Sequence, residues 1–291
     1  MEALTGAGRT LRIAVLFAFA GEGVLTLMDA LVKTQTSRYP LMQVTFLRFI
    51  FGALVATAVV TVLRPRFPGP EALRFHGLRA FLSVFTATTF FYGLSKMPIA
   101  EAMALGFLSP LFMVAFGVLL LKETFDVRIA MALAAGIAGL IVIVSGQFTA
   151  DTYSVETLKG AAAIVVSAVL YALVVIMLRA RATVDPISVI VFLQSAIPAA
   201  ILAVPAWIVW QPVASEDLGK FAVIGCLAIA GHTLIANAFK RAEAARLAPI
   251  HYTILLWGIL YGYLFFGDVP GAATLAGAGL IAVATLIAQR K

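Results

Sequence analysis

Long apolar runs recur along the chain, and short polar segments separate them. A helix that crosses a bilayer needs about 20 mainly apolar residues, because the hydrocarbon core is about 30 Å thick and each helical residue rises about 1.5 Å. Ten runs meet this requirement. We therefore predict an all-α integral membrane protein with transmembrane helices at residues 12–32, 41–63, 74–95, 100–121, 128–147, 159–179, 187–210, 218–240, 246–266 and 270–288.

Landmark residues of the first half of the chain return in the second half at a spacing of 145 or 146 residues. The matches include Pro40 with Pro186, Leu47 with Leu193, Gly117 with Gly262 and Glu123 with Asp268. A constant offset that halves the chain indicates an internal repeat. We predict two five-helix repeats, residues 1–147 and 148–291, in one membrane domain. Because five is odd, the second repeat is inverted in the membrane, an arrangement characteristic of secondary transporters.

Composition and charge refine this picture. Hydrophobic residues make up 62% of the 291 residues, and mean hydropathy is +1.04, far above the value of a soluble globular domain. The net charge is +7. With the N-terminus inside, fifteen Lys and Arg residues, Arg79 among them, fall on the cytoplasmic side and five on the other. This bias predicts a plasma (inner) membrane protein with both termini in the cytoplasm, and not a nucleic-acid partner.

Two stretches of the sequence carry a family resemblance. Residues 91–146 read FYGLSKMPIAEAMALGFLSPLFMVAFGVLLLKETFDVRIAMALAAGIAGLIVIVSG, and residues 238–287 read AFKRAEAARLAPIHYTILLWGILYGYLFFGDVPGAATLAGAGLIAVATLI. Both resemble the repeated half-domain of the EamA family in the drug/metabolite transporter (DMT) superfamily, in which an acidic residue closes one apolar helix and a Gly-rich helix follows. Arg48 matches the arginine that this family has in its second span.

The resemblance implies a ten-helix secondary transporter whose first, third, fourth, sixth, eighth and ninth helices surround the transport path. We suspect similarity to the YddG-type amino-acid exporters of this superfamily. The sequence departs from the family pattern at two places: Ile254-Leu255 in the second copy replaces Ser109-Pro110 of the first, and Glu22-Gly23 replaces the usual Trp-Gly in the first span.

Ionisable residues at membrane depth are costly, so each is a candidate functional residue. Glu22, Thr26, Asp29 and Lys33 are spaced by 4, 3 and 4 residues and share one face of the first helix. Glu22 lies about 15 Å inside the membrane and has no evident partner in the sequence. It is either a protonated carboxyl that hydrogen-bonds across helices or a site for a substrate ammonium group or a proton. The second alternative gives proton coupling through Glu22.

Asp29 and Arg48 lie at similar depths in the first and second spans, each nearer the outer side. We predict that they form a structural or gating ion pair, with Lys33 as the competing partner of Asp29 four residues away. Their role is therefore expected to be structural.

Other candidates cluster near the predicted midplane. Tyr171, His232 and Trp257 are each about half-way along a span, and so is the Ser109-Pro110 pair, whose proline frees a backbone carbonyl. Aromatic walls around a few polar atoms are typical of small-molecule pockets, but each residue could equally pack in the core. The predicted substrate-binding or coupling residues are Glu22, Tyr92, Ser109, Pro110, Tyr171, His232, Trp257 and Tyr261.

Glu123 and Asp268 end two corresponding spans. An acidic residue at a helix C-terminus opposes the helix dipole, so we expect each to cap the helix that follows or to pair with a neighbouring base. Both are predicted to be structural.

These observations predict a secondary transporter that exports amino acids, including aromatic and other apolar ones, or related small metabolites by alternating access through a midplane cavity. The alternatives are an exporter or importer of another small metabolite or drug-like cation, and an intramembrane enzyme. The sequence has no Walker motif, zinc signature or dinucleotide fingerprint. We expect a small-molecule substrate and membrane lipid as partners, no cofactor and no metal.

Overall fold

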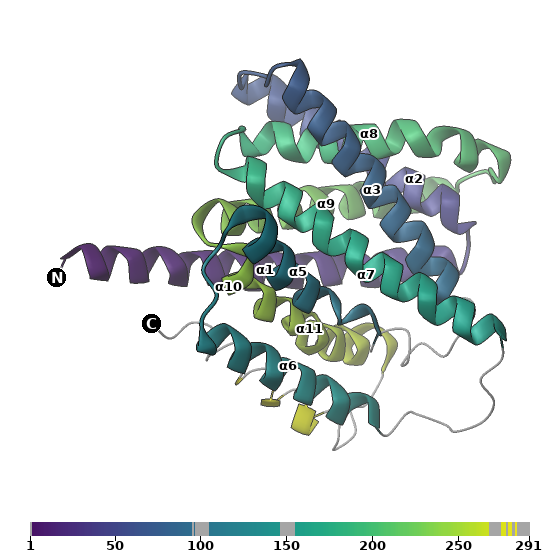
Figure 1. Cartoon of the computed structure of the whole chain (residues 1–291). Helices are drawn as coiled ribbons and strands as arrows, with labels where there is room; N and C mark the ends of the chain where they lie inside the picture. The colour runs from purple at the N-terminus through teal and green to yellow at the C-terminus, as the bar shows by residue number, and fades with distance from the viewer. Residues whose placement is uncertain are drawn as a thin grey trace.

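The computed structural model describes residues 2–94, 96, 105–145 and 155–267, together with 275–277, 279, 280 and 283. Helices make up nearly all of this part (Figure 1). They are α1 (Glu2–Thr36), α2 (Leu41–Leu63), α3 (Pro70–Leu94), α5 (Ser109–Leu121), α6 (Val127–Ser145), α7 (Val155–Ala182), α8 (Ile187–Ile208), α9 (Ser215–Arg241), α10 (Ala244–Leu247), the 3-10 helix η1 (Ala248–Tyr252), α11 (Thr253–Tyr261) and the π-helix η2 (Gly262–Phe266).

Within the described part, six helical segments are long and apolar enough to cross a membrane, and two further helices are apolar but shorter. The first nine predicted spans each coincide with helical structure in the described residues. Most of the tenth predicted span, residues 270–288, lies outside the described residues, as does Asp268. The count of ten helices therefore stays a prediction.

The ninth predicted span, residues 246–266, is not one continuous α-helix. The chain passes from α10 through the 3-10 turn η1 into α11 and ends in the π-helical turn η2. Pro249, which has no backbone N–H to donate, stands at the start of η1. Changes of helical type of this kind are frequent at functional sites.

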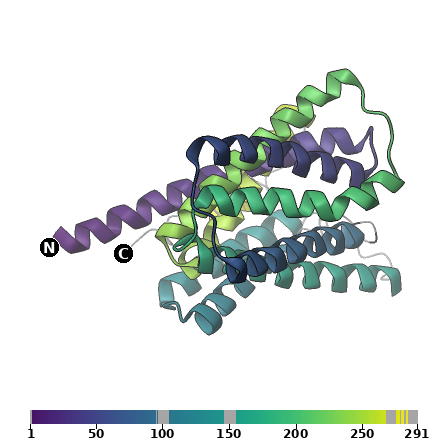
Figure 2. The same ribbon diagram turned by 90° about the horizontal axis from the view of Figure 1, so that it is seen from above.

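Helices from the two halves of the chain pack against each other in a reciprocal way (Figures 1 and 2). The first helix of each half packs on the third helix of the other half, α1 on α9 and α7 on α3, and the second helices α2 and α8 pack on each other. The first turns of α1 extend beyond the other helices. This exchange is the packing that two structural repeats produce when they interlock.

A polar corner ties the α1–α2 connection to the start of α9. The hydroxyl of Tyr39 donates to Asp217 Oδ2 at 2.7 Å, and Arg38 pairs with Asp217 at 2.9 Å and with Glu216 at 3.1 Å. The hydrogen bond to Glu216 and the negative charge of Asp217 raise the pKa of Arg38 above its ordinary value. The end of the bundle that holds this corner is called the Asp217 end below.

A second corner ties the α7–α8 connection to α3. Asp185, which lies 146 positions after Tyr39, accepts hydrogen bonds from Arg181 at 2.6 and 2.7 Å and contacts His76 Nε2 at 2.8 Å. Because α2 separates the two corners by 23 residues, or about 34 Å, they lie at opposite ends of the bundle. The end that holds the second corner is called the Asp185 end below.

Removal of the Asp185 charge should destabilise the fold. Burial alone would raise the pKa of this carboxyl, but the hydrogen bonds from Arg181 and His76 outweigh burial and hold the pKa below its ordinary value. The carboxylate therefore stabilises the folded state above about pH 4 and loses this effect as the pH falls through its lowered pKa. Asp185→Asn should cost about 2–3 kcal/mol, because the buried His76 and the partly buried Arg181 lose an anionic acceptor.

This prediction is checked by thermal unfolding in detergent at several pH values. The difference in Tm between wild type and Asp185→Asn should be largest at neutral pH and should shrink below about pH 4. Glu71→Gln, at an exposed position in the first turn of α3, is the matched control and should leave Tm unchanged. An Asp185→Asn protein as stable as wild type would show that the corner does not hold the fold.

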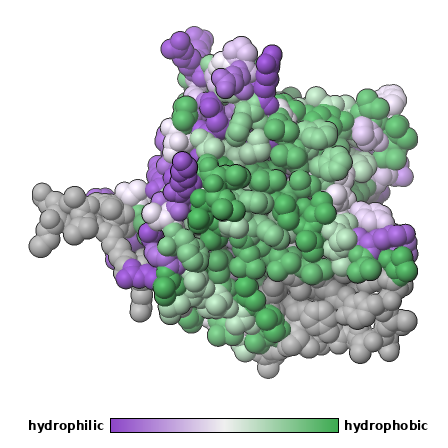
Figure 3. All heavy atoms as spheres, in the orientation of Figure 1, coloured by the Kyte–Doolittle hydropathy of each residue, from purple (hydrophilic) through white to green (hydrophobic). Residues whose placement is uncertain are grey.

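On the face shown in Figure 3, apolar side chains cover the middle and polar side chains gather toward the edges. Large hydrophobic side chains of the helices are exposed, among them Leu54 of α2, Val166 of α7 and Val204 of α8. Such exposure would be unfavourable in water, whereas lipid tails are an apolar solvent. The helices therefore present a lipid-facing band, as a multi-pass membrane protein requires.

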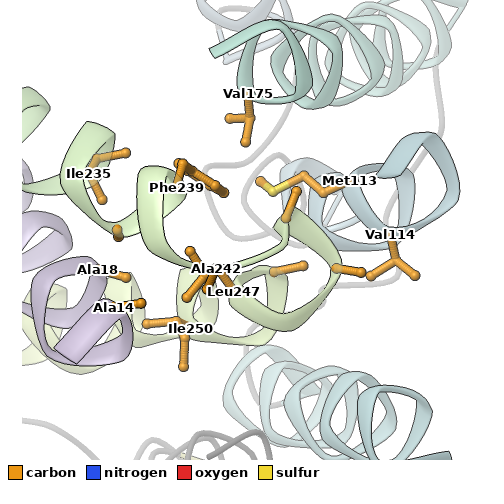
Figure 4. Close-up of a cluster of buried hydrophobic side chains, with 14 of the residues drawn as sticks. Ala14, Ala18, Met113, Val114, Val175, Ile235, Phe239, Ala242, Leu247 and Ile250 are labelled. Atoms are coloured by element: carbon orange, nitrogen blue, oxygen red, sulfur yellow. The ribbon is translucent and has the colours of Figure 1, made fainter. Parts of the chain in front are cut away.

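The largest hydrophobic cluster closes the Asp185 end. Its side chains come from α1, α5, α7, α9 and the α10–η1 segment and point toward one another, as the labelled residues of Figure 4 show. Ala182 and Ile190, on either side of Asp185, belong to the same cluster. Apolar packing thus closes the interior at the Asp185 end. The polar side chains of the interior lie on the side of this cluster that faces the Asp217 end.

Candidate functional site

A carboxylate and an imidazole meet beside the hydrophobic cluster of the Asp185 end. Glu22 Oε1 of α1 lies 3.1 Å from His251 Nδ1 of η1, and Glu22 is only 8% exposed. The expectation that Glu22 has no partner is therefore wrong. The partner lies 229 positions away in the sequence and is placed there by the 3-10 turn, which interrupts the ninth span. A histidine beside a proline in an apolar run was the available signal.

A small cavity of about 20 Å³ adjoins this pair. Glu22, Tyr171 and His251 supply its polar atoms, and side chains of the hydrophobic cluster complete the wall. The Tyr171 ring stacks on the His251 ring with 5.1 Å between centroids. A cavity of this size holds about one water molecule. The structure thus brings together two of the predicted residues, Glu22 and Tyr171, and adds His251, which was not among the candidates.

Asp29 and Arg48 are close but do not touch. The charge of Arg48 acts on the Asp29 carboxylate, yet among the described side chains no hydrogen bond or ion pair joins either residue to a partner. The predicted Asp29–Arg48 ion pair is therefore not formed. Asp29 is exposed, and the guanidinium of Arg48 lies 4.7 Å from the centre of the Phe49 ring. The side chain of Lys33 lies outside the described part of the structure.

Arg48 has a further feature that the sequence did not reveal. Its Nε atom is buried and has no hydrogen-bond partner among the described residues. Leaving a buried donor unpaired costs about 1–3 kcal/mol, and more when the group is charged. Arg48 therefore keeps one buried donor without a hydrogen-bond partner among the described residues.

A second polar chain connects α9, α8 and α3. His232 Nδ1 lies 3.1 Å from Gln194 Nε2, and Gln194 Oε1 accepts a hydrogen bond of 2.8 Å from Arg79 Nη1. Arg79, which was counted with the cytoplasmic charges, is only 2% exposed, so it is a buried cation and not a solvent-exposed one. It faces α8 because α3 packs on α8 over this stretch. Gln194 was also missed, although it stands 146 positions after Arg48.

Trp257 packs on α1 and makes a specific contact there. Its Nε1 donates to the Phe19 carbonyl at 3.1 Å, and its ring stacks on Tyr261 with 5.9 Å between centroids. A Cβ atom on Gly23 would lie 2.6 Å from the Trp257 ring, so glycine is required for this approach. Neither Trp257 nor Tyr261 lines the two cavities described here. Their role in substrate binding stays a prediction, and their role in α1–α11 packing is visible.

Changes at this contact should mainly reduce stability. Trp257→Ala removes a large half-buried ring and a hydrogen bond, for an expected loss of about 3–5 kcal/mol. Gly23→Ala should also destabilise, because the added methyl group forces the ring away. Thermal unfolding in detergent measures both, with Gly77→Ala, where nothing lies within 4 Å, as the control. Wild-type Tm for Gly23→Ala would contradict the packing described.

An apolar cavity of about 270 Å³ lies between α2, α3 and α8. Its wall includes Phe49, Thr88, Tyr92 and Leu202. Phe49 separates this cavity from the Arg48 guanidinium, because its ring is both part of the wall and the surface under that cation. Of the predicted residues, Tyr92 belongs here. The cavity lies in the half of the bundle that contains the Asp217 end, since it is lined by the first turns of α2.

The remaining predicted residues make contacts that stabilise the fold. Ser109 and Pro110 are buried in the first turn of α5, where a proline is tolerated, and they line neither cavity. Glu123 accepts hydrogen bonds from the backbone N–H groups of Ala244 and Ala245, both at 2.9 Å, and pairs with Arg179 at 3.3 Å.

The base partner expected for Glu123 is therefore present, but the helix that it caps is α10 and not the following helix. Asp126 caps α6 instead, by accepting from the Ile129 N–H at 3.0 Å. Among the described residues no group of three or more His, Cys, Asp or Glu side chains is arranged to hold a metal ion.

Comparison with known proteins agrees with this architecture. The sequence profile of the EamA-like transporter family matches residues 12–145 and matches again at residues 158–289. The chain belongs to the EamA-like transporter family. The double match corresponds to the two halves that interlock in the structure, and membership makes this EamA-like transporter a multi-pass membrane protein.

Relatives with assigned substrates extend over nearly the whole chain. The pseudopaline exporter CntI of Pseudomonas aeruginosa is 27% identical over 287 residues, covering 96% of this chain and 97% of the exporter. The S-adenosylmethionine uptake transporter of Rickettsia bellii is 26% identical over 259 residues, covering 89% and 87%. A solved crystal structure has a TM-score of 0.80 at 25% identity, covering 94% of this chain and 97% of that chain. The comparisons support a transporter of small metabolites.

Proposed function

We propose that this EamA-like protein is a secondary transporter of zwitterionic amino acids, including aromatic and other apolar ones, or of closely related small metabolites, and that it works by alternating access. The observation that carries the proposal is the separation of Asp29 and Arg48. The two charges, on α1 and α2, act on each other without contact, and neither has a hydrogen-bond or ion-pair partner among the described side chains. A bound zwitterion supplies the missing partner of each charge.

The energetics favour this role over a structural one. Opposite charges that are partly removed from water attract strongly, and a structural pair closes to direct contact because an uncompensated charge costs several kcal/mol. A gap between them is stable when a ligand fills it. An α-amino acid places an ammonium group and a carboxylate on the same carbon, so the ammonium is directed to Asp29 and the carboxylate to Arg48 through charge-assisted hydrogen bonds.

The apolar cavity beside Phe49 supports a preference for apolar side chains. Its volume of about 270 Å³ exceeds the roughly 150 Å³ of an engineered protein cavity that binds benzene. Thr88 and Tyr92 give its wall a few polar atoms, which is the usual composition of a small-molecule pocket. A phenylalanine-sized ligand with its charged groups between Asp29 and Arg48 would place its ring in this cavity once the Phe49 ring turns aside.

The closure at one end supports alternating access. The hydrophobic cluster seals the Asp185 end, whereas Asp29, about 10 Å from the Asp217 end of α1, is exposed. We place the protein in the inner membrane with both termini in the cytoplasm. In this orientation the closed Asp185 end faces the cytoplasm. Export then also requires a second state, which is open at the Asp185 end and closed at the Asp217 end. Protons that enter through the Glu22–His251 pair supply the driving force.

Ligand-dependent thermal stabilisation tests the proposed substrate class. L-phenylalanine should raise Tm in detergent, whereas phenethylamine and 3-phenylpropionate, which each lack one of the two charges, should raise it far less. L-leucine and L-methionine serve as further zwitterions. Equal stabilisation by phenylalanine and phenethylamine would contradict the role of Arg48, and stabilisation by no zwitterion would contradict the proposed substrate class.

A further inference from the structure

We propose that Arg79 is a second carboxylate-binding residue, which takes over the substrate carboxylate from Arg48 when the bundle opens at the Asp185 end. The inference rests on the proposed function, because it assigns a second position to the same substrate group. The ligand chemistry is a carboxylate of a zwitterionic metabolite. In the present conformation Arg79 is closed off and holds no anion.

The first observation is an uncompensated charge. Arg79 donates only to the neutral oxygens of Gln194, at 2.8 Å, and Ile190, at 3.3 Å. Its buried Nε has no partner among the described residues. No described carboxylate forms a hydrogen bond or an ion pair with the Arg79 guanidinium. Asp185, on the neighbouring corner, binds Arg181 and His76 instead. A guanidinium that is 2% exposed and lacks a counter-charge is expensive, which favours a role in another state.

The second observation is the relation of Arg79 to Arg48 through the repeat. Arg48 of α2 corresponds to Gln194 of α8, 146 positions later, and α2 packs on α9 in the way that α8 packs on α3. In the α2–α9 interface the cation comes from α2. In the equivalent α8–α3 interface α8 provides a glutamine and the cation comes from α3. Each half of the bundle therefore has one arginine at corresponding depth.

The third observation is that the two arginines share a neighbour. His232 is bonded to Gln194, the partner of Arg79, and the charges of both Arg48 and Arg79 act on the His232 ring. His232, Gln194 and Arg79 thus form a hydrogen-bonded chain, and the charge of Arg48 acts on its His232 end. Arg79 lies one helical turn inside the His76–Asp185 contact, so it is an interior cation close to the Asp185 end.

These placements give a sequence of contacts for transport. The carboxylate of a substrate that enters from the Asp185 end binds to Arg79. It replaces the Gln194 and Ile190 oxygens as the acceptor of the Arg79 hydrogen bonds. When that end closes, Arg79 returns to Gln194, and the carboxylate passes to Arg48 at the Asp217 end. No covalent step is involved. Both polar corners are formed in this structure, so we infer that they stay formed during transport. The two states then differ in which arginine binds the carboxylate.

The experiment measures transport from each face separately. Full-length protein is reconstituted into liposomes, the two orientations are resolved by a membrane-impermeant inactivating reagent, and half-saturation concentrations for L-phenylalanine are determined from each side. Arg79→Gln should raise the value about tenfold or more at the Asp185 face and less than about threefold at the other face. Arg48→Gln should give the reverse pattern. Arg74→Gln, at an exposed position of the same helix, is the matched control.

The outcomes separate this inference from the proposed function. Saturable wild-type flux with an Arg79→Gln effect that is equal at both faces, or absent, would overturn the inference and leave the proposed function standing. Absence of saturable wild-type flux for any zwitterion would overturn both. Should Arg79→Gln not fold, Arg79→Lys keeps the charge and loses the planar fork, and it should show a smaller shift at the Asp185 face alone. An equal shift at both faces would contradict the proposal.

Discussion

Arg48→Gln is expected to raise the half-saturation concentration for L-phenylalanine by about 10- to 100-fold. Glutamine keeps a polar group of similar reach but removes the charge, and a hydrogen bond to a charged group contributes about 1.5–3 kcal/mol. The loss should appear in transport and in ligand-dependent Tm shifts alike. Because Arg48 has no described hydrogen-bond or ion-pair partner and only the Phe49 ring under its guanidinium, its removal should leave the Tm of the ligand-free protein unchanged or slightly higher.

The same variant makes a sharper prediction about analogues. Wild type should prefer phenylalanine to phenethylamine, which lacks the carboxylate, and Arg48→Gln should lose this preference. Asp29→Asn should lose the preference for phenylalanine over 3-phenylpropionate, which lacks the ammonium group. Arg66→Gln, exposed in the α2–α3 connection, controls for loss of positive charge. An Arg48→Gln transporter that still favours the carboxylate would show that another residue binds it.

Glu22→Gln is expected to abolish the response of transport to a pH gradient. Glu22 and His251 form an acid–base pair between the two halves of the chain, beside a cavity that holds about one water molecule. Under the proposed coupling, a proton held between these two side chains would be carried when the surrounding helices change their exposure. In proteoliposomes whose lumen is one pH unit more acidic, wild type should accumulate phenylalanine about tenfold, since one pH unit corresponds to 1.36 kcal/mol.

The decisive comparison is with exchange, which needs no net proton movement. Glu22→Gln and His251→Gln should exchange internal for external phenylalanine at rates near wild type while they fail to accumulate it in response to the gradient. Glu71→Gln, an exposed acidic position on α3, should behave as wild type in both assays. Gradient-driven accumulation by Glu22→Gln would place coupling elsewhere.

Much of the fold follows from the hydrophobic pattern. The start and end of α2 and the start of α8 lie where the apolar runs predict them, because a spanning helix has to match the hydrocarbon thickness. The broken ninth span was not predictable in this way. Hydropathy averages over a window and does not register the helical type, so the 3-10 turn that orients His251 leaves little trace in the sequence.

The polar residues of the interior were predictable as types but not as partners. Glu22, Asp29 and Arg48 stood out because charges in apolar runs are rare. Which residues they meet depends on packing between helices far apart in the chain, as His251 shows for Glu22. The burial of Arg79 was not predicted, because its position near a helix end gives no sign of the packing of α3 on α8 that buries it. A charge count by loop cannot detect this difference.

Transport of labelled L-phenylalanine into proteoliposomes preloaded with unlabelled phenylalanine tests the central claim most directly. The wild-type protein should show saturable counterflow that excess leucine or methionine inhibits and that phenethylamine inhibits poorly, and Arg48→Gln and Asp29→Asn should each reduce it at least about tenfold at low substrate concentration. Counterflow that is unchanged when the charge of both Asp29 and Arg48 is removed would contradict the account.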